Sequence, residues 1–431
     1  MSRLRDLLPA WLPEWVRDAR LLVSSQALVV ATTTVLAIVL ARSLGPSEWG
    51  LLSGLLGLAM AVSIVVNLGI GTWLLRELSR VAHEQGDVGK RHELASRMVA
   101  GTLAANAALG LLVLSAVLAV EIALDVEKST VTTTMLLTLY SVCLTLGTSC
   151  ETFLRAERRL VRMTGGVLIE RVLVLGLVAV ALLLGFGVIA VAAAHLVAGL
   201  ARLAFAGYSV FAVAGLALVR PRRPEIERLV RGGVPFAFNT TALVAIPKLD
   251  TLIVSTMSVT AAGYFALGDR ILGPAVFVPV VAGTALYPFL AREMHSTKSG
   301  ALAMAMAIVG VSVAVVGVVS APLLVPFIFG EEYEDAVPVV QVMLCSLPFI
   351  YASNTLLPHV YTSGLERGVF VVTLFSAVAG TGAVALGQAA LGATGAAAGA
   401  VLRQLLFALS LSMLALRGGT QDPVTQSSRT R

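Results

Sequence analysis

Apolar runs long enough to cross a lipid bilayer recur along the whole chain and are separated by short polar breaks. An α-helix needs about 20 mostly apolar residues to span the hydrocarbon core. The pattern therefore predicts an all-α integral membrane protein of about twelve spanning helices. We expect these spans at 21–41, 50–71, 98–120, 131–151, 164–185, 188–217, 232–257, 262–290, 302–329, 336–361, 368–387 and 392–416.

Composition agrees with lipid as the main solvent of the chain. Hydrophobic residues make up 57% of the 431 residues and charged residues only 13%. A chain of this composition has more apolar surface than one soluble core could bury. The net charge of +6 lies in short loops between apolar runs, so we expect no nucleic-acid partner. The three cysteines, Cys143, Cys150 and Cys345, lie inside apolar runs without metal-ligand or disulfide spacing. We accordingly predict no metal site and no cofactor.

The basic residues are distributed unevenly between alternate loops. They are concentrated at 76–97, 155–162, 220–231 and 292–298, whereas the other loops contain acidic runs at 121–127 and 331–335. Cytoplasmic loops carry the excess of Lys and Arg in membrane proteins. The pattern predicts a multi-pass protein of the cell membrane with both termini in the cytoplasm, and an even number of spans. The segment 7–15, with two tryptophans, is typical of a membrane interface.

The chain is also internally doubled. The turn 44–50 after the first expected span resembles the turn 259–265 after the seventh, and each is followed by a new apolar run. Six spans in each half give both halves the same orientation, as in parallel repeats. We predict two six-helix bundles, one at 1–219 with the interfacial N-terminal segment and one at 220–431 with a short cytoplasmic tail.

Three stretches resemble one known family: Leu40–Gly50, Gly263–Arg270 and Phe329–Pro338. The first contains Arg42, Gly45, Pro46 and Gly50, and is similar to the first-loop signature of the polysaccharide-exporting, O-antigen-flippase-like transporters. These belong to the multidrug/oligosaccharidyl-lipid/polysaccharide exporter superfamily. Trp49 departs mildly from the usual Tyr or Phe. The resemblance implies a MATE-like fold of two bundles around a central cavity, and a lipid-linked oligosaccharide as substrate.

Ionisable residues within expected spans are candidates for function, because charge is costly at membrane depth. Arginine binds phosphate bidentately and stays charged, so a basic cavity would suit the phosphate of a lipid-linked sugar. If Glu170 offsets Arg171, and the charges of residues 248–270 cancel, two arginines remain as a positive surplus. The phosphate-binding candidates are Arg202, Lys248, Arg270 and Arg403. The candidates for coupling or gating are Asp250, Asp269, His195 and Pro274.

Structural interpretations stand beside these. The members of the pairs Lys248–Asp250 and Asp269–Arg270 would neutralise each other's charge. His195 would be a packed, hydrogen-bonded side chain. Arg42 would then set only loop geometry, and Gly45 and Pro46 a turn. Proline at position 274 permits a bend beside a substrate path, although such bends are common in inert helices too.

The leading hypothesis is a flippase that is not an enzyme. It would carry a polyprenyl-(pyro)phosphate-linked glycan from the cytoplasmic to the outer leaflet by alternating access, with glycosyltransferases and a glycan polymerase of the same pathway as partners. A cation-driven multidrug antiporter is the first alternative, and it would need unpaired carboxylates. A membrane-embedded glycosyltransferase or polymerase is the second, and it would need a large outer loop. Coupling to protons or sodium ions stays open.

Overall fold

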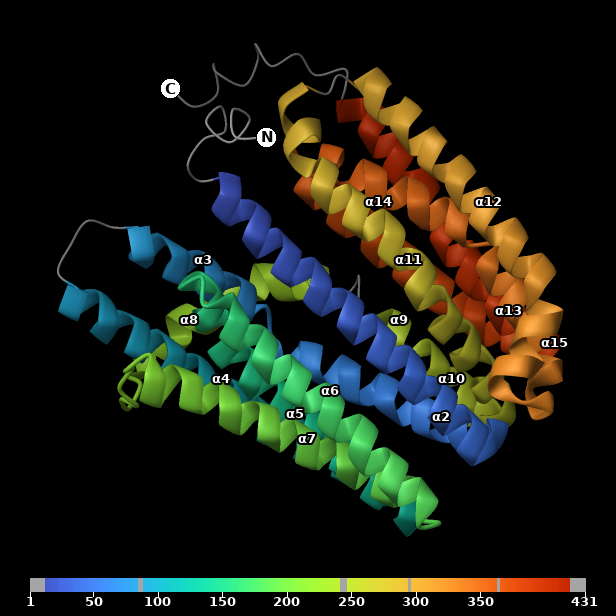
Figure 1. Cartoon of the computed structure of the whole chain (residues 1–431), viewed down its shortest axis with the longest axis horizontal. Helices are drawn as coiled ribbons and strands as arrows, with labels where there is room; N and C mark the ends of the chain where they lie inside the picture. Colours follow the sequence, from blue (N-terminus) through green and yellow to red (C-terminus); the bar gives the residue numbers. More distant parts are fainter. Residues whose placement is uncertain (1–11, 84–87, 241–245, 294–295, 363–364, 419–431) are drawn as a thin grey trace. The chain divides into compact units, whose positions relative to one another are not determined.

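The computed structural model describes residues 12–83, 88–240, 246–293, 296–362 and 365–418, and every regular element in these ranges is helical. The predicted interfacial segment lies partly, and the predicted C-terminal tail almost entirely, outside the described residues. By their internal contacts the helices form two units (Figure 1). Unit 1 comprises residues 1–36 and 62–237, and unit 2 comprises residues 37–61 and 238–431. Residues 37–61, from the first half of the sequence, thus pack with the second half.

The first long helix, α2 (Leu12–Asn67), contributes to both units. The remaining helices of unit 1 are α3 (Ile70–His83), α4 (Val88–Ala123), α5 (Lys128–Ala156), α6 (Leu160–Leu183), α7 (Val188–Tyr208), the π-helical turn η1 (Ser209–Val213) and most of α8 (Arg223–Thr240). Those of unit 2 are α9 (Ile246–Lys248), α10 (Asp250–Met257), α11 (Val259–Glu293), α12 (Ser296–Phe329), the 3-10 helix η3 (Glu331–Ala336), α13 (Val337–Leu344), α14 (Leu347–Thr362) and α15 (Glu366–Gly418).

Eight helices in the described part of the chain are long and apolar enough to cross a membrane. Two of them, at 26–67 and 367–416, are 42 and 50 residues long, about twice the length that one crossing requires. Each contains a glycine with left-handed backbone, Gly45 (φ 71°) and Gly392 (φ 66°), where two helices join. These eight helices therefore cover ten of the expected spans. The other two, 232–257 and 262–290, fall on α8 to α11.

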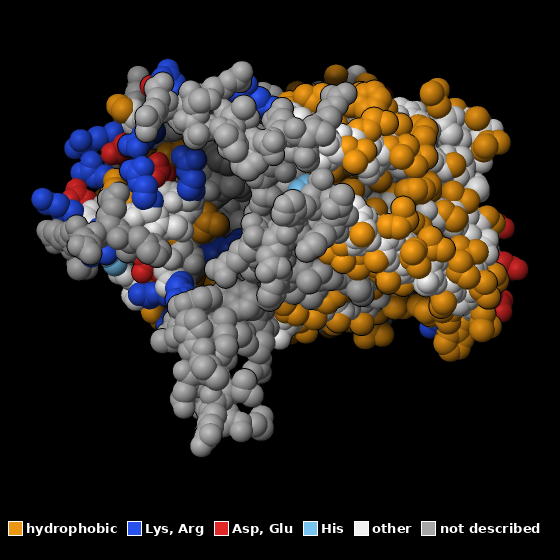
Figure 2. All heavy atoms as spheres, turned by 90° about the horizontal axis from the view of Figure 1, so that it is seen from above, with side chains coloured by type: hydrophobic (Ala, Val, Ile, Leu, Met, Phe, Trp, Pro, Cys, Tyr) orange, Lys and Arg blue, Asp and Glu red, His pale blue; other side chains and the backbone are white. Residues whose placement is uncertain are grey.

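The surface of the long helices is what a lipid environment requires. In α4 and α12 only 17% of the most apolar 18-residue stretch is buried within the protein. Apolar side chains accordingly cover much of the visible surface in Figure 2. In water so much exposed apolar area would be unfavourable, whereas acyl chains accommodate it. The predicted fold class, an all-α integral membrane protein, is confirmed.

Within unit 2, the second half of α2 packs on α10 and α11 with glycine at the contact. A Cβ atom built on Gly50 would lie 1.9 Å from the carbonyl oxygen of Val259, and one on Gly57 would lie 2.4 Å from that of Lys248. Backbones this close leave no room for a side chain, as is common where membrane helices associate. The contact fixes this segment of α2 against the helices that carry Lys248 and the Gly263–Arg270 stretch.

We expect Gly50→Val to reduce the yield of folded protein strongly. The added side chain collides with backbone rather than with a flexible neighbour, and overpacking alone costs about 1–3 kcal/mol. The matched control is Gly176→Val on α6, where nothing lies within 4 Å of a built Cβ. Fluorescence-detected size-exclusion chromatography in mild detergent measures both. Equal monodisperse yields for the two variants would contradict the packing described.

Candidate functional site

The three stretches that carry the family resemblance meet within unit 2. Buried Tyr333 donates a hydrogen bond to the carbonyl oxygen of Ala41 at 3.1 Å, and its ring packs edge-on against Tyr264 with centroids 6.4 Å apart. The guanidinium group of Arg42 donates to the carbonyl oxygen of Phe327 at 2.5 Å. Tyr333 and the backbone of Phe327 thus hold the turn between the two halves of α2, and Tyr264 packs against Tyr333.

The signature-loop residues form this turn and the helix that follows it. Gly45 adopts φ 71° and ψ 173°, a conformation that L side chains rarely adopt. Pro46 begins the next helical segment, and a Cβ built on Gly263 would lie 2.0 Å from the carbonyl oxygen of Pro46. A Cβ built on Gly50 would lie 2.6 Å from the backbone nitrogen of Gly263, so these two glycines of the similar turns lie against each other. The contacts seen at Arg42, Gly45, Pro46 and Gly50 are those of a turn and a close helix contact.

A charged surface lies on α9 and α11, which we call the Lys248–Arg270 surface. The Nζ atom of Lys248 lies 3.3 Å from Oδ2 of Asp269, and these side chains are 41% and 49% exposed. The guanidinium carbon of Arg270 lies 5.8 Å from the ring centre of buried Trp49, within the range of a cation–π interaction. Lys248 and Asp269 are each about ten residues from the turn at Ser258, about 15 Å along a helix. This is about half the thickness of the hydrocarbon core.

A second, buried ion pair lies on neighbouring helices of unit 2. Asp250, only 1% exposed, accepts a hydrogen bond from the Thr381 hydroxyl at 2.9 Å and another from Nη1 of Arg403. The aliphatic part of Arg403 lies over Gly380, where a Cβ would approach it to 2.3 Å. The pair ties α10 to the two halves of α15. The charge of Arg403 is therefore neutralised by Asp250 in the protein.

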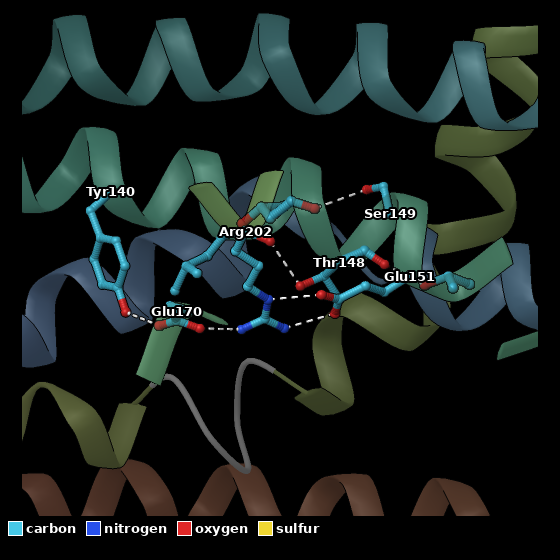
Figure 3. Close-up of polar contacts among 9 residues, drawn as sticks. Tyr140, Thr148, Ser149, Glu151, Glu170 and Arg202 are labelled. Atoms are coloured by element: carbon cyan, nitrogen blue, oxygen red, sulfur yellow. Dashed lines mark hydrogen bonds and ion pairs between the residues drawn. The ribbon is translucent and has the colours of Figure 1, made fainter. Parts of the chain in front are cut away.

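A buried network of charged residues in unit 1 joins Arg202 to two carboxylates (Figure 3). Arg202 of α7 donates from Nε and Nη2 to the two oxygens of Glu151 at 2.8 and 2.7 Å, and from Nη1 to Glu170 at 2.6 Å. The hydroxyl of Tyr140 donates to the other oxygen of Glu170 at 2.7 Å. Glu170 is fully buried and Glu151 is 5% exposed. The network joins α5, α6 and α7 at a depth where unpaired charge would be costly.

This pairing corrects the expected surplus at Arg202 and Arg403. Glu151 stands at the very end of the expected span 131–151, whereas α5 continues to Ala156. Glu170 bonds Arg202 rather than only offsetting its sequence neighbour Arg171, because adjacent residues on a helix point in different directions. In unit 1 the set Glu151, Glu170, Arg171 and Arg202 has no net formal charge.

The charge balance of unit 2 is different. Lys248, Arg270 and Arg403 against Asp250 and Asp269 leave a formal charge of three minus two, or +1. The pairs found, Lys248–Asp269 and Asp250–Arg403, also differ from the suggested pairing of sequence neighbours. Since Asp250 and Arg403 neutralise each other, the charges of this set that remain are those of Lys248, Asp269 and Arg270.

Two other candidates have contacts that are mainly structural. His195 is 5% exposed, its Nδ1 lies 2.8 Å from the carbonyl oxygen of Val191, and its ring packs edge-on against Tyr140 at 5.5 Å. Pro274 lies within α11 and has no N–H for the carbonyl group of Arg270, four residues earlier. Their roles in coupling or gating stay predictions. Among the described residues no group of His, Cys, Asp and Glu could hold a metal ion.

The fold is that of known membrane exporters. The structure titled as the inward-facing conformation of a multidrug resistance MATE family transporter of the MOP superfamily superposes with a TM-score of 0.68 at 18% identity, covering 93% of this chain and 96% of that one. An outward-facing MATE transporter gives a TM-score of 0.56 at 19% identity, covering 96% of each chain. A MATE structure in the straight conformation gives 0.54 at 19% identity, again covering 96% of each. The helices and their order thus define a membrane transporter fold.

The family is shown by sequence. The family model described as polysaccharide biosynthesis protein matches residues 15–294, about two thirds of the chain. The chain therefore belongs to the polysaccharide biosynthesis protein family, and the family resemblance is confirmed. The match includes the stretches Leu40–Gly50 and Gly263–Arg270, whereas Phe329–Pro338 lies outside it. A search of curated proteins returns no match.

Proposed function

We propose that the protein is a flippase that moves a polyprenyl-(pyro)phosphate-linked oligosaccharide or polysaccharide precursor from the cytoplasmic to the outer leaflet. The family supports a role in polysaccharide biosynthesis, and the fold supports transport. Glycosyltransferases of the same pathway would supply the precursor, and a glycan polymerase would use it after transport. The cargo of such a flippase would carry its charge on phosphate.

The observation that carries the choice of cargo is the Lys248–Arg270 surface. An ion pair that is more than 40% exposed at membrane depth is stable against water rather than acyl chains, because hydrocarbon cannot solvate charge. We therefore propose that water reaches this side of α9 and α11. Lys248 and Arg270 are the cations that this surface would offer to an anionic headgroup, and they would disfavour an organic cation.

The other two basic candidates, Arg202 and Arg403, have a structural role in this proposal. Arg202 and Arg403 are held by buried carboxylates within 4 Å, so they stabilise helix packing. Lys248 and Arg270 are the cations presented to a headgroup, and alternating access would expose them to each side in turn. An inside-negative potential favours outward movement of an anion by about 2.3 kcal/mol per charge at 100 mV.

Depletion of the protein in its own cells tests this function. Lipid-linked glycan should accumulate in the inner leaflet, protected from a periodate or lectin probe added outside, while total glycan synthesis continues. Re-expression of the wild-type chain should restore accessibility. Unchanged glycan accessibility, together with increased retention of cationic dyes, would instead identify a multidrug exporter and overturn the proposal.

A further inference from the structure

Helix α8 of unit 1 is short and amphipathic, and its apolar side is covered by protein. It is not among the described helices that are long and apolar enough to span a membrane. Leu229 is 2% exposed and packs in a cluster with Ile70 and Trp73. A Cβ on Gly232 would lie 2.2 Å from the indole nitrogen of Trp73, so α8 lies directly on α3. Among the described side chains of α8, those of Glu227, Arg228 and Arg231 are exposed.

Two arginines from α3 and α8 are held side by side by one buried carboxylate. Glu77, with a side chain 10% exposed, lies 3.5 Å from Nε of Arg80 and 3.9 Å from Nη2 of Arg228. These two guanidinium side chains are 65% and 71% exposed. Arg231, one turn after Arg228, is 80% exposed. The carboxylate therefore orients two guanidinium groups that extend outward.

Of the two acidic residues of α8, Glu225 bonds other residues and Glu227 pairs with one of these arginines. Residues 220–231 contain five Arg and two Glu. Glu225 accepts a hydrogen bond from the backbone N–H of Arg222 at 2.9 Å and another from Arg97 at 3.3 Å. These bonds lower the pKa of Glu225 below its usual value, so its carboxylate stays ionised and bonded to Arg222 and Arg97. Glu227 pairs with Arg231 at 2.6 Å, but both side chains are exposed and such pairs are weak.

We propose that the surface formed by Arg76, Arg80, Arg228 and Arg231, the α3–α8 surface, binds the phosphate groups of anionic phospholipids of the surrounding bilayer. Arg76 is exposed one turn before Arg80 on α3. Figure 2 shows Lys and Arg side chains gathered at one end of the visible face. Arginine binds phosphate in a bidentate manner, and basic segments next to membrane spans attract anionic leaflets. Among the α8 side chains that the structure describes, the exposed ones are Pro224, Glu227, Arg228 and Arg231, and most of them are charged.

Native mass spectrometry of the full chain in detergent tests the proposal, with dioctanoyl phosphatidylglycerol as probe and dioctanoyl phosphatidylcholine as the zwitterionic comparison. One variant is Arg76→Gln/Arg231→Gln, which leaves Glu77 with its partners. A second, Glu77→Gln/Arg80→Gln/Arg228→Gln, removes the buried carboxylate together with its cations. We expect each to raise the Kd for phosphatidylglycerol at least about tenfold, without changing that for phosphatidylcholine.

The matched control is Arg155→Gln/Arg162→Gln, which removes the same charge as the first variant from exposed positions around the α5–α6 turn. It should change the Kd for phosphatidylglycerol less than about twofold. Equal losses in the control and the first variant would show that phosphatidylglycerol is attracted by net charge alone, and this would overturn the site. Unchanged binding of phosphatidylglycerol by the first variant would overturn it as well. A third contradicting result would be a loss of binding seen only with polyprenyl diphosphate as an additional probe. If the second variant does not fold, the first decides, and neither result depends on glycan transport.

Discussion

Arg202→Met is expected to cost about 3–5 kcal/mol of folding stability, because it leaves two buried carboxylates without their shared cation. Arg202 makes three hydrogen bonds to Glu151 and Glu170, all between 2.6 and 2.8 Å. Neither carboxylate can turn to water, since Glu170 is fully buried and Glu151 is 5% exposed. The apparent unfolding midpoint and the yield in detergent should both fall well below those of the wild type.

The rescue of this variant separates charge pairing from packing. Glu151→Gln/Glu170→Gln/Arg202→Met removes the whole set of paired charges, and replacing a buried ion pair by neutral groups is often close to neutral. We therefore expect the triple variant to recover most of the lost midpoint. Arg155→Met, at the exposed end of α5, should stay within about 0.5 kcal/mol of the wild type. A stable single variant, or a triple variant no better than the single one, would disprove the network.

Lys248→Gln/Arg270→Gln is expected to reduce transport of the lipid-linked glycan at least about tenfold, because a hydrogen bond to a charged group contributes about 1.5–3 kcal/mol. The change reverses the formal charge of the Lys248–Arg270 surface from +1 to −1, with Asp269 left unpaired. Because Lys248 and Asp269 are more than 40% exposed, the remaining carboxylate is solvated and folding should be nearly unchanged.

Two controls make this result specific. Lys128→Gln removes a cation at the exposed start of α5 and should leave transport as it is. Asp269→Asn makes the surface more positive and should keep or strengthen headgroup binding. Wild-type transport by the double variant, at equal protein amount, would show that these two cations do not receive the substrate.

The spans and the family could be predicted from the sequence, because both depend on local features. A run of apolar residues determines a membrane helix wherever its neighbours lie. The turn 44–50 keeps its signature because Gly45 needs a left-handed backbone and Gly50 faces the carbonyl oxygen of Val259. The predicted topology, with both termini in the cytoplasm, stays a prediction.

The pairing of charges could not be predicted, because it depends on which helix faces lie together. Sequence neighbours suggested Lys248–Asp250 and Asp269–Arg270, yet Lys248 lies 3.3 Å from Asp269 and Asp250 bonds Arg403. The latter pair joins residues 153 positions apart. Hydropathy alone also placed Glu151 at a membrane edge. A pattern of acidic residues on the same helix face as buried Ser and Thr would have pointed to it.

The most direct test of the central claim is transport by the purified protein in proteoliposomes. A short-chain polyprenyl-diphosphate oligosaccharide is supplied in one leaflet, its appearance in the other is followed by an impermeant probe, and a cationic dye is assayed in parallel. We predict that the protein moves the glycan lipid and that Lys248→Gln/Arg270→Gln lowers this rate without creating dye transport. Movement of the dye but not of the glycan lipid would contradict the account.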